Sequence, residues 1–228
     1  MADLIKARLP QATDRVRIIH NWADGKAIYP IPAVANPMRE LWGLKGKFVV
    51  GYSGNMGRGH EFETLLRAAE ELRTDDRFVF LLIGDGVRRG EIEQRIQEWS
   101  LGNVMLRPYQ PREQLAQSLS VPDVHVVSMR PELEGLMLPS KLYAITAAGR
   151  PTVFIGHPVG EVAVMLREGR CGFAVAQGNW PGLVDQLQRL ANNENLRVGM
   201  GHYARERFER KYDKPLAMKA WKELLRAL

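Results

Sequence analysis

Residues 134–151, EGLMLPSKLYAITAAGRP, combine side chains that could hold both an anion and a sugar. Pro139 and Ser140 open a short apolar helical pattern, and proline fits the first turn of a helix because its missing N–H group is not needed there. The free N–H groups and the dipole of such a helix end favour an anion, and Lys141 adds a positive charge. Glu134 could accept hydrogen bonds from a polyol. The segment therefore predicts a phosphate site beside a sugar site.

A glycine-rich run, GYSGNMGRGH at residues 51–60, lies between a predicted strand and a predicted helix. Glycines let the backbone approach a phosphate closely, and Arg58 could pair with that phosphate through two hydrogen bonds. The run matches neither the Walker loop nor the GxGxxG dinucleotide pattern. A flexible strand–helix turn is the alternative interpretation.

Two further loops follow predicted strands and are candidates for the same crevice. Gly84-Asp85-Gly86 could face a ligand, with Arg88 and Arg89 beyond it to neutralise a diphosphate, although Asp-Gly is also ordinary turn chemistry. Arg107-Pro108-Tyr109 could offer a nucleobase a rigid edge of backbone groups, or could be a simple turn. Residues 20–25, HNWADG, are typical of a capped structural turn.

Other kinds of chemistry find little support in the sequence. His60, His157 and His202 lack the paired spacing of metal ligands, so we expect no metal site. No GxSxG nucleophile elbow is present. The single cysteine, Cys171, excludes an internal disulfide and is typical of a small buried hydrophobe, which fits a reducing cytoplasm.

The composition is that of a globular protein with room for one good core in its 228 residues. No stretch approaches the ~20 apolar residues of a membrane span, and we expect no signal peptide in MADLIKARLP. The formal net charge of +6 is compatible with anionic ligands, nucleic acid or an acidic membrane face. Aromatic and basic residues do not interleave as in single-strand-binding proteins, so we expect no nucleic-acid partner.

Short β-rich runs alternate with amphipathic runs along the chain. The predicted strands are Arg17–His20, Phe48–Tyr52, Phe78–Ile83, Val104–Leu106, Asp123–Val127, Thr152–Ile155 and Phe173–Val175. The predicted helices between them are Glu61–Arg73, Gly90–Trp99, Arg112–Ser118, Ser140–Ala148, Val159–Arg167 and Trp180–Asn192. This alternation predicts an α/β fold around a parallel sheet, which binds ligands beyond the carboxyl ends of its strands. The loops at Gly54, Gly84 and Glu134 would then face one crevice.

The sequence predicts no alternation of strands and helices at the two ends of the chain. Residues 1–16 are expected to form a helix and a linker that lead into the domain of residues 17–193. Within that domain, the prolines of residues 28–40 indicate an irregular connection. Glu194–Lys211 and Pro215–Leu228 read as two terminal helices without an intervening strand.

The order YSGN…HEFETLLRAAE, LLIGDGVRRGEIE and EGLMLPSKLYAITAAGRP is similar to the C-terminal half of family-four glycosyltransferases, from about Val16 to the last helix. Those enzymes have the GT-B fold, in which two Rossmann-like domains face a cleft and the C-terminal one binds the nucleotide-sugar donor. HNWADGKAIYP resembles the segment by which the family enters this domain. PSKLY together with AAGRP resembles bacterial enzymes of polysaccharide or O-antigen assembly. The resemblance implies the Rossmann-like donor half of a GT-B enzyme, with helices at residues 194–228 that pack back towards a missing N-terminal domain.

The resemblance also implies roles for single residues of the 134–151 segment. Glu134 matches the first acid of the family's two-glutamate motif, which hydrogen-bonds the donor sugar. Ser140 and Lys141 would lie at the diphosphate. Backbone N–H groups for sugar hydroxyls or phosphate would come from Gly135, Leu136 and Met137. The second glutamate, which holds the ribose in the family, falls on Ala144, so the sugar contacts are better supported than the ribose contact.

The other two loops match the family less closely. The Gly54 loop corresponds to the glycine-rich loop under the donor phosphates, and Arg107 to Tyr109 correspond to the strand end that holds the base. The family's usual arginine and lysine fall on Asn55 and His60, and Arg58 is a candidate substitute for the missing charge. His60 would help a diphosphate only when it is protonated, which at its reference pKa of ~6.5 is partial at neutral pH.

The activity implied by the resemblance is transfer of a glycosyl group, with retention of configuration, from a nucleotide diphosphate sugar to a hydroxyl acceptor. We expect a UDP-sugar as donor, no cofactor and no metal, and we expect the helix end, Lys141 and Arg58 to stabilise the leaving diphosphate. A sugar or lipid-linked acceptor would need an N-terminal domain of ~100–200 further residues, so this chain alone should be inactive. The expected location is cytoplasmic, with peripheral contact to the cytoplasmic face of the membrane.

Two other functions stay open from the sequence. One is a sugar-nucleotide 2-epimerase of the same two-domain architecture, for which no acid–base set can be identified in these residues. The other is a phosphate- or nucleotide-binding module without chemistry. A preference for a whole nucleotide sugar over simple anions would favour the transferase.

Overall fold

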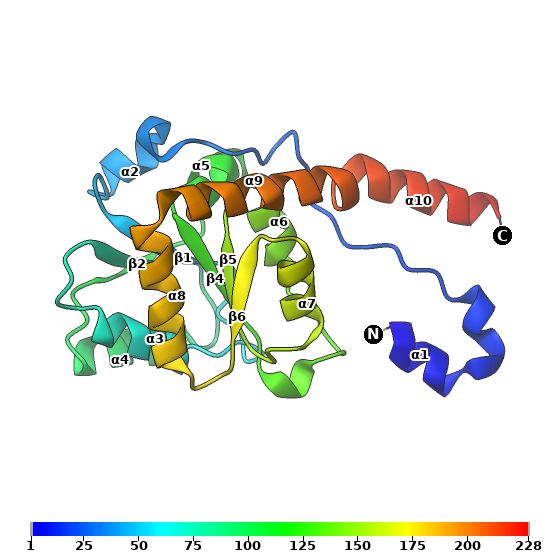
Figure 1. The fold of residues 1–228 in the computed structure, drawn as a ribbon, viewed down its shortest axis with the longest axis horizontal. Coiled ribbons are helices and arrows are strands. Elements are labelled where there is room, and N and C mark those ends of the chain that lie inside the picture. Colours follow the sequence, from blue (N-terminus) through cyan, green and yellow to red (C-terminus); the bar gives the residue numbers. More distant parts are fainter. Residues whose placement is uncertain (1, 228) are drawn as a thin grey trace.

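The computed structural model describes residues 2–227 and contains a six-stranded sheet in the order β3-β2-β1-β4-β5-β6 (Figure 1). All neighbouring strands in it are parallel. The strands are Phe48–Ser53 (β1), Phe78–Ile83 (β2), Val104–Arg107 (β3), Val124–Ser128 (β4), Thr152–Ile155 (β5) and Gly172–Val175 (β6). These apolar runs are almost entirely buried in the central strands, as expected for a parallel sheet with both faces covered.

Helices cover both faces of the sheet. They are Ala2–Arg8 (α1), Pro37–Leu41 (α2), Glu63–Glu71 (α3), Arg89–Glu98 (α4), Leu115–Ser120 (α5), Lys141–Ala147 (α6), Glu161–Glu168 (α7), Trp180–Asn192 (α8), Glu194–Lys211 (α9) and Lys214–Arg226 (α10). α3 and α8 pack on one face, where Leu65 and Leu187 join the core around Phe80. α2, α6 and α7 cover the other face through residues such as Met38 and Leu142.

The strand predictions hold for β1 to β6, with bounds that differ by at most one residue. The predicted strand at Arg17–His20 is wrong, because the structure gives this stretch no strand assignment and leaves Ile18 62% exposed. Two isoleucines between an arginine and a histidine offer too little apolar area to draw the segment onto a sheet edge.

The helix predictions hold with small changes. The bounds of α8 and α9 are those expected, whereas the predicted helix Arg112–Ser118 divides into a 3₁₀ turn and α5. Residues 28–40 are less irregular than expected, since they contain α2, whose first residue is Pro37. The Asn36 side chain caps α2 by accepting a hydrogen bond from the Met38 N–H group at 3.0 Å. Met1 and Leu228, to which the predicted terminal segments extend, lie outside the described residues.

The terminal segments reach beyond the body of the domain. α9 runs along α6 and buries Ala204 and Phe208, whereas α10 continues past the end of the sheet and α1 lies apart from it (Figure 1). On α10, Trp221 is 42% exposed and Leu225 is 64% exposed. The domain boundaries expected at residues 16 and 193 stay predictions.

The strand order brings several loops together at the carboxyl edge of the sheet, and the place where they meet is called the crevice below. From β1 the chain builds the sheet outwards on one side through β2 and β3, and it then returns to add β4, β5 and β6 on the other side. The switch point of the sheet therefore lies between β1 and β4. Ligands of parallel sheets bind at this switch point. The loops that follow β1, β2 and β4 begin at Gly54, Gly84 and Met129, and they therefore surround the same point.

Candidate functional site

Two glycine loops meet backbone to backbone at the carboxyl ends of β1 and β2. Gly54 N–H donates to the carbonyl of Ile83 at 2.9 Å, and Met56 N–H donates to the carbonyl of Asp85 at 2.8 Å. Gly84 has φ +146°, and a Cβ there would lie 2.0 Å from the Gly54 carbonyl oxygen. Gly54 itself has φ +132°. Only glycine permits this contact between the loops, and the approach of their backbone to a phosphate stays a prediction.

Lys141 brings the 134–151 segment to the Gly54 loop. Its Nζ donates to the Tyr52 hydroxyl at 2.5 Å, lies 3.9 Å from the centre of the Tyr52 ring, and stands 3.5 Å from His60 Nε2. Its Cε lies 3.2 Å from the point that a Cβ on Gly54 would occupy. Burial lowers the pKa of Lys141 to about 7. The structure therefore brings together two motifs that lie about 85 residues apart.

His60 is held as a neutral ring beside this lysine. Its Nδ1 lies 2.6 Å from the carbonyl of Ser128, and since a carbonyl can only accept, Nδ1 carries the proton and Nε2 is the acceptor. Burial, and then the positive charge of Lys141, lowers the pKa of His60. At neutral pH the ring thus offers a lone pair to Lys141 and contributes little of the charge considered from the sequence.

The arginines near these loops fall into two kinds. Arg88 donates to the carbonyl of His60 at 2.6 Å and pairs with a glutamate of α4, and Arg89 donates to the carbonyl of Gly84 at 2.9 Å and pairs with another. Both therefore hold the loops in place, and this differs from the expectation that they neutralise a diphosphate. Arg58 is exposed and makes no ion pair or hydrogen bond with a described residue. The neighbouring Asn55 is exposed as well.

Asp85 and the two residues expected near a base lie on the β2 and β3 side of the crevice. The Asp85 carboxylate accepts from the Gly86 N–H group at 2.7 Å, which is turn chemistry, and its carbonyl lies 3.3 Å from the Tyr109 hydroxyl. Tyr109 is 55% exposed. Arg107 points its guanidinium towards Trp42, with 5.8 Å to the ring centroid, and its buried Nε has no protein partner.

Glu134 faces the beginning of α7. Its Oε1 accepts from the N–H group of Glu161 at 2.7 Å, while its buried Oε2 has no hydrogen-bond partner. A Cβ on Gly160 would lie 2.3 Å from Oε2, so glycine makes room for the carboxylate. Oε1 thus accepts from the first turn of α7, and Oε2 is available to a hydrogen-bond donor.

The backbone after Glu134 offers fewer free donors than expected. The N–H groups of Leu136 and Met137 both donate to the carbonyl of Leu133, whereas Gly135, at φ +76°, makes no such bond. Ser140 is exposed at the N-terminal end of α6, and its side chain caps nothing. The predicted donors are therefore near each other in the chain but are only partly available in this conformation.

Comparison with known proteins decides the family. A sequence model described as "Glycosyl transferases group 1" matches residues 37–207. The chain belongs to this family. The resemblance to family-four glycosyltransferases drawn from the sequence is thereby confirmed.

Two relatives show how much of a group 1 protein this chain represents. It is 29% identical over 205 residues to a protein named as a colanic acid biosynthesis glycosyl transferase, WcaI of Escherichia coli, covering 89% of this chain and 49% of that protein. It is 27% identical over 155 residues to a protein named as a glycosyltransferase, WbjE of Pseudomonas aeruginosa, covering 68% of this chain and 38% of that protein. The chain thus spans less than half the length of these relatives.

Solved structures confirm the predicted Rossmann-like fold of a GT-B half. Anabaena HepE in complex with UDP and glucose superposes with a TM-score of 0.81 at 18% identity, over 98% of this chain and 61% of that one. The C-terminal domain of a group 1 protein, LpcC of Francisella tularensis, superposes with a TM-score of 0.68 at 17% identity, over 84% of this chain and 99% of that one.

Three polar groups near the Gly54 loop of this domain were not identified from the sequence: one hydroxyl, one backbone carbonyl and one carboxylate. Tyr52 holds Lys141 but reads as a core residue of β1, and the Ser128 carbonyl that orients His60 carries no side-chain signal at all. The buried Glu61 caps Thr64 through Oε1 and leaves Oε2 without a partner. The acid three residues before Thr64, next to the glycine loop, is the signal that could have indicated it.

Two absences apply to the part of the chain that the structure describes. Residues 2–227 include no group of three His, Cys, Asp or Glu side chains placed to share a metal ion. No helix within the same residues is long and apolar enough to cross a bilayer.

Proposed function

We propose that this chain is the donor-binding half of a glycosyltransferase that takes its sugar from a nucleotide diphosphate sugar, a UDP-sugar in the first instance. The observation that carries the proposal is the approach of Lys141 to the Gly54 loop at the switch point of the sheet. A cation, a glycine-rich loop and the first residue of a helix meet there, and this arrangement suits a diphosphate. The solved complexes of HepE with UDP and with UDP-glucose add support.

In this proposal Lys141 supplies the charge that the Gly54 loop lacks at Asn55 and His60. With a pKa of about 7, the lysine is only partly charged at neutral pH in the free protein. A neighbouring diphosphate favours the charged form, so a proton is taken up as the donor binds. The cation then stabilises the negative charge that grows on the leaving diphosphate as the glycosidic bond breaks. Arg58, exposed and unpaired among the described residues, is the second cation for the same role.

Glu134 would position the donor sugar. Its Oε2 is buried and has no protein partner, so a sugar hydroxyl would be able to donate to it. The Gly135 N–H group and Ser140 complete the contacts that we propose to the sugar and the phosphates. Asp85, Arg107 and Tyr109 would line the end of the crevice that takes the nucleoside.

The whole protein would need a second domain to bind the acceptor. The chain covers less than half of WcaI and WbjE, and we expect no turnover from these residues alone. We propose a sugar or lipid-linked acceptor in bacterial polysaccharide biosynthesis, with the enzyme in the cytoplasm and in peripheral contact with the membrane. No metal or cofactor takes part in this proposal. The comparisons give the epimerase alternative no support.

Isothermal titration of the chain with UDP-glucose, UDP, GDP and inorganic phosphate tests this proposal. We expect UDP-glucose and UDP to bind more tightly than GDP, and phosphate to bind weakest at the crevice. Donor binding should release protons from a buffer above pH 7, because Lys141 takes one up; the heat of binding then varies with the ionisation enthalpy of the buffer. Equal affinity for all four ligands would instead indicate a simple anion-binding module.

A further inference from the structure

A pocket lies at the opposite edge of the sheet, at the amino ends of β4 and β5. It has a volume of about 440 Å³, within the usual range of small-molecule sites. Residues 30–34 form one wall, Asp123 and residues 149–151 form the floor, and α9 forms the other wall. Its lining includes no residue of the loops that follow β1, β2 and β4, so it is a different site from the crevice.

Basic side chains predominate in the lining of this pocket. They are Arg150, Arg197, His202 and Arg205. The acids in the lining are Asp123 and Glu194. The question is whether these two acids neutralise the arginines.

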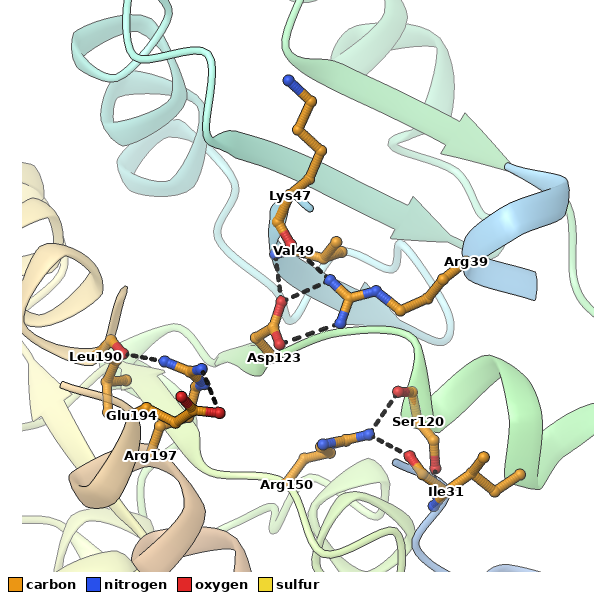
Figure 2. Close-up of polar contacts among 10 residues, drawn as sticks. All are labelled: Ile31, Arg39, Lys47, Val49, Ser120, Asp123, Arg150, Leu190, Glu194 and Arg197. Carbon is orange, nitrogen blue, oxygen red and sulfur yellow. Dashed lines mark hydrogen bonds and ion pairs between the residues drawn. The ribbon is translucent and has the colours of Figure 1, made fainter. Parts of the chain in front are cut away.

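Asp123 forms an ion pair with Arg39, which does not line the pocket. Its two oxygens accept from the Arg39 guanidinium at 3.1 and 2.8 Å, and Oδ2 also accepts from the Val49 N–H group at 2.8 Å (Figure 2). Arg39 completes its own bonds with the carbonyl of Lys47 at 2.6 Å. This bidentate pair is closed, and it leaves no carboxylate for the pocket.

Arg150 has no counter-ion among the described residues. Its Nη2 donates to the carbonyls of Ile31 at 2.6 Å and Ser120 at 2.7 Å, and its buried Nε has no partner (Figure 2). Burial lowers the pKa of Arg150; Asp123 opposes this shift, while Arg39 and Arg197 add to it. The only hydrogen bonds that Arg150 makes to described residues are therefore to carbonyls, and its Nη1 makes none.

The other two arginines of the lining differ in how closely a carboxylate approaches them. Arg197 donates to the carbonyl of Leu190 at 2.7 Å, and its nearest carboxylate oxygen, on the largely exposed Glu194, is 3.9 Å away (Figure 2). Arg205 pairs with Glu209 at 2.7 Å. The pocket thus keeps a net positive charge, which Arg150 and Arg197 contribute.

We propose that this pocket binds the phosphate group of a small phosphomonoester. Two guanidinium groups that lack close carboxylates match a doubly charged phosphate better than a singly charged carboxylate. The walls add apolar surface from Ile31 and Val198, which suits the carbon part of an ester. The occupant would join residues 30–34 to α9 and thereby stabilise the domain from the side opposite the crevice.

The test uses the full chain with its crevice saturated by UDP, followed by titration with glycerol 3-phosphate, inorganic phosphate or sulfate. Binding is read by calorimetry and by backbone NMR shifts. We expect saturable binding of glycerol 3-phosphate, with shifts at Gly149, Val198 and Gly201. The inorganic phosphate arm separates free phosphate from the ester, and tighter binding of the ester shows that the apolar walls take part.

Three variants locate the site. Arg197→Gln should weaken glycerol 3-phosphate binding by about tenfold or more, as expected for one lost charge-assisted hydrogen bond, and His202→Gln should weaken it less. Arg210→Gln, an exposed arginine on the same helix outside this pocket, is the matched control and should change nothing. All three should bind UDP normally, which also shows that they are folded. Shifts confined to the Gly54 loop, or an unchanged affinity in Arg197→Gln, would overturn the proposal.

Discussion

Arg39 at the amino edge of the sheet and Lys141 at its carboxyl edge are both buried cations, but their surroundings are opposite. At the amino edge, Arg39 meets Asp123 through two hydrogen bonds, and the pair is 7% and 11% exposed in its side chains. At the carboxyl edge, Lys141 meets only the Tyr52 hydroxyl and the neutral ring of His60. Among the residues that the structure describes, Arg39 has a counter-ion, whereas Lys141 has none.

This difference indicates which of the two cations serves stability and which serves a ligand. A buried pair with all its hydrogen bonds made is a structural feature, because removing one partner leaves a charge buried without compensation. A buried cation without an acid costs stability in the free protein and regains it when an anion binds.

Asp123→Asn should destabilise the domain strongly without affecting the donor site. The substitution leaves Arg39 buried without a counter-ion, which costs about 3–5 kcal/mol. Urea unfolding measures the loss, and UDP affinity of the folded fraction should be unchanged. Glu40→Gln is the matched control, since it removes an exposed pair with Lys45 and should have a much smaller effect. Equal effects of both substitutions would contradict the structural role of Asp123.

Lys141→Met should weaken UDP binding without lowering the stability of the domain. Losing a charge-assisted contact to the diphosphate weakens UDP binding by about 10- to 100-fold, while the stability of the free domain is kept or rises because a desolvated cation is removed. Calorimetry and urea unfolding measure the two effects on one sample. Lys45→Met, on the exposed face, should change neither. If Lys141→Met bound UDP as tightly as the original chain, Lys141 would not be at the diphosphate.

The pH dependence of UDP binding should reveal the same lysine. The pKa of Lys141 is about 7 in the folded chain, against 10.5 ordinarily, so above pH 7 the free protein loses a proton that donor binding needs. UDP affinity should therefore fall above pH 7, by at most about tenfold per pH unit. The unfolded chain keeps that proton between pH 7 and 10.5, so the Lys141 contribution to the unfolding free energy rises with pH over this window. In Lys141→Met both slopes should flatten, and slopes that persist there would belong to another group.

Glu134→Gln should have the smallest effect, and it should be selective. The amide keeps the bond to the N–H group of Glu161 but loses the charge near the sugar and the α7 end, which is worth about 0.3–1 kcal/mol of stability. We expect UDP-glucose affinity to fall several-fold and UDP affinity to stay constant. An equal loss for both ligands in calorimetry would show that Glu134 acts only by capping α7.

The sheet and its loops could be predicted from the sequence because their signals are local. Each strand of the sheet is a short apolar run between glycine, proline or charged residues, and the parallel order then brings the loops after β1, β2 and β4 together. The wrong strand prediction at Arg17–His20 also comes from a local signal. A local apolar run predicts a strand, but only a neighbouring strand can satisfy its backbone, and none lies there.

The electrostatics of the site could be predicted only in part. Lys141 and Glu134 were identified by type and position, yet the sequence does not reveal that Lys141 is buried against Tyr52 or that Glu134 caps α7. Both contacts join residues far apart in the chain. For the same reason the availability of Arg88 and Arg89 was overestimated, since their partners are backbone carbonyls that carry no sequence signal.

The contact between Gly84 and the carbonyl of Gly54 has a consequence for attempts to change the donor. There is no space between the two loops for even one methyl group. Neither loop can therefore be exchanged by itself for a longer or bulkier one. Nucleotide preference in this scaffold should therefore be altered only by transplanting both loops together from one homologue.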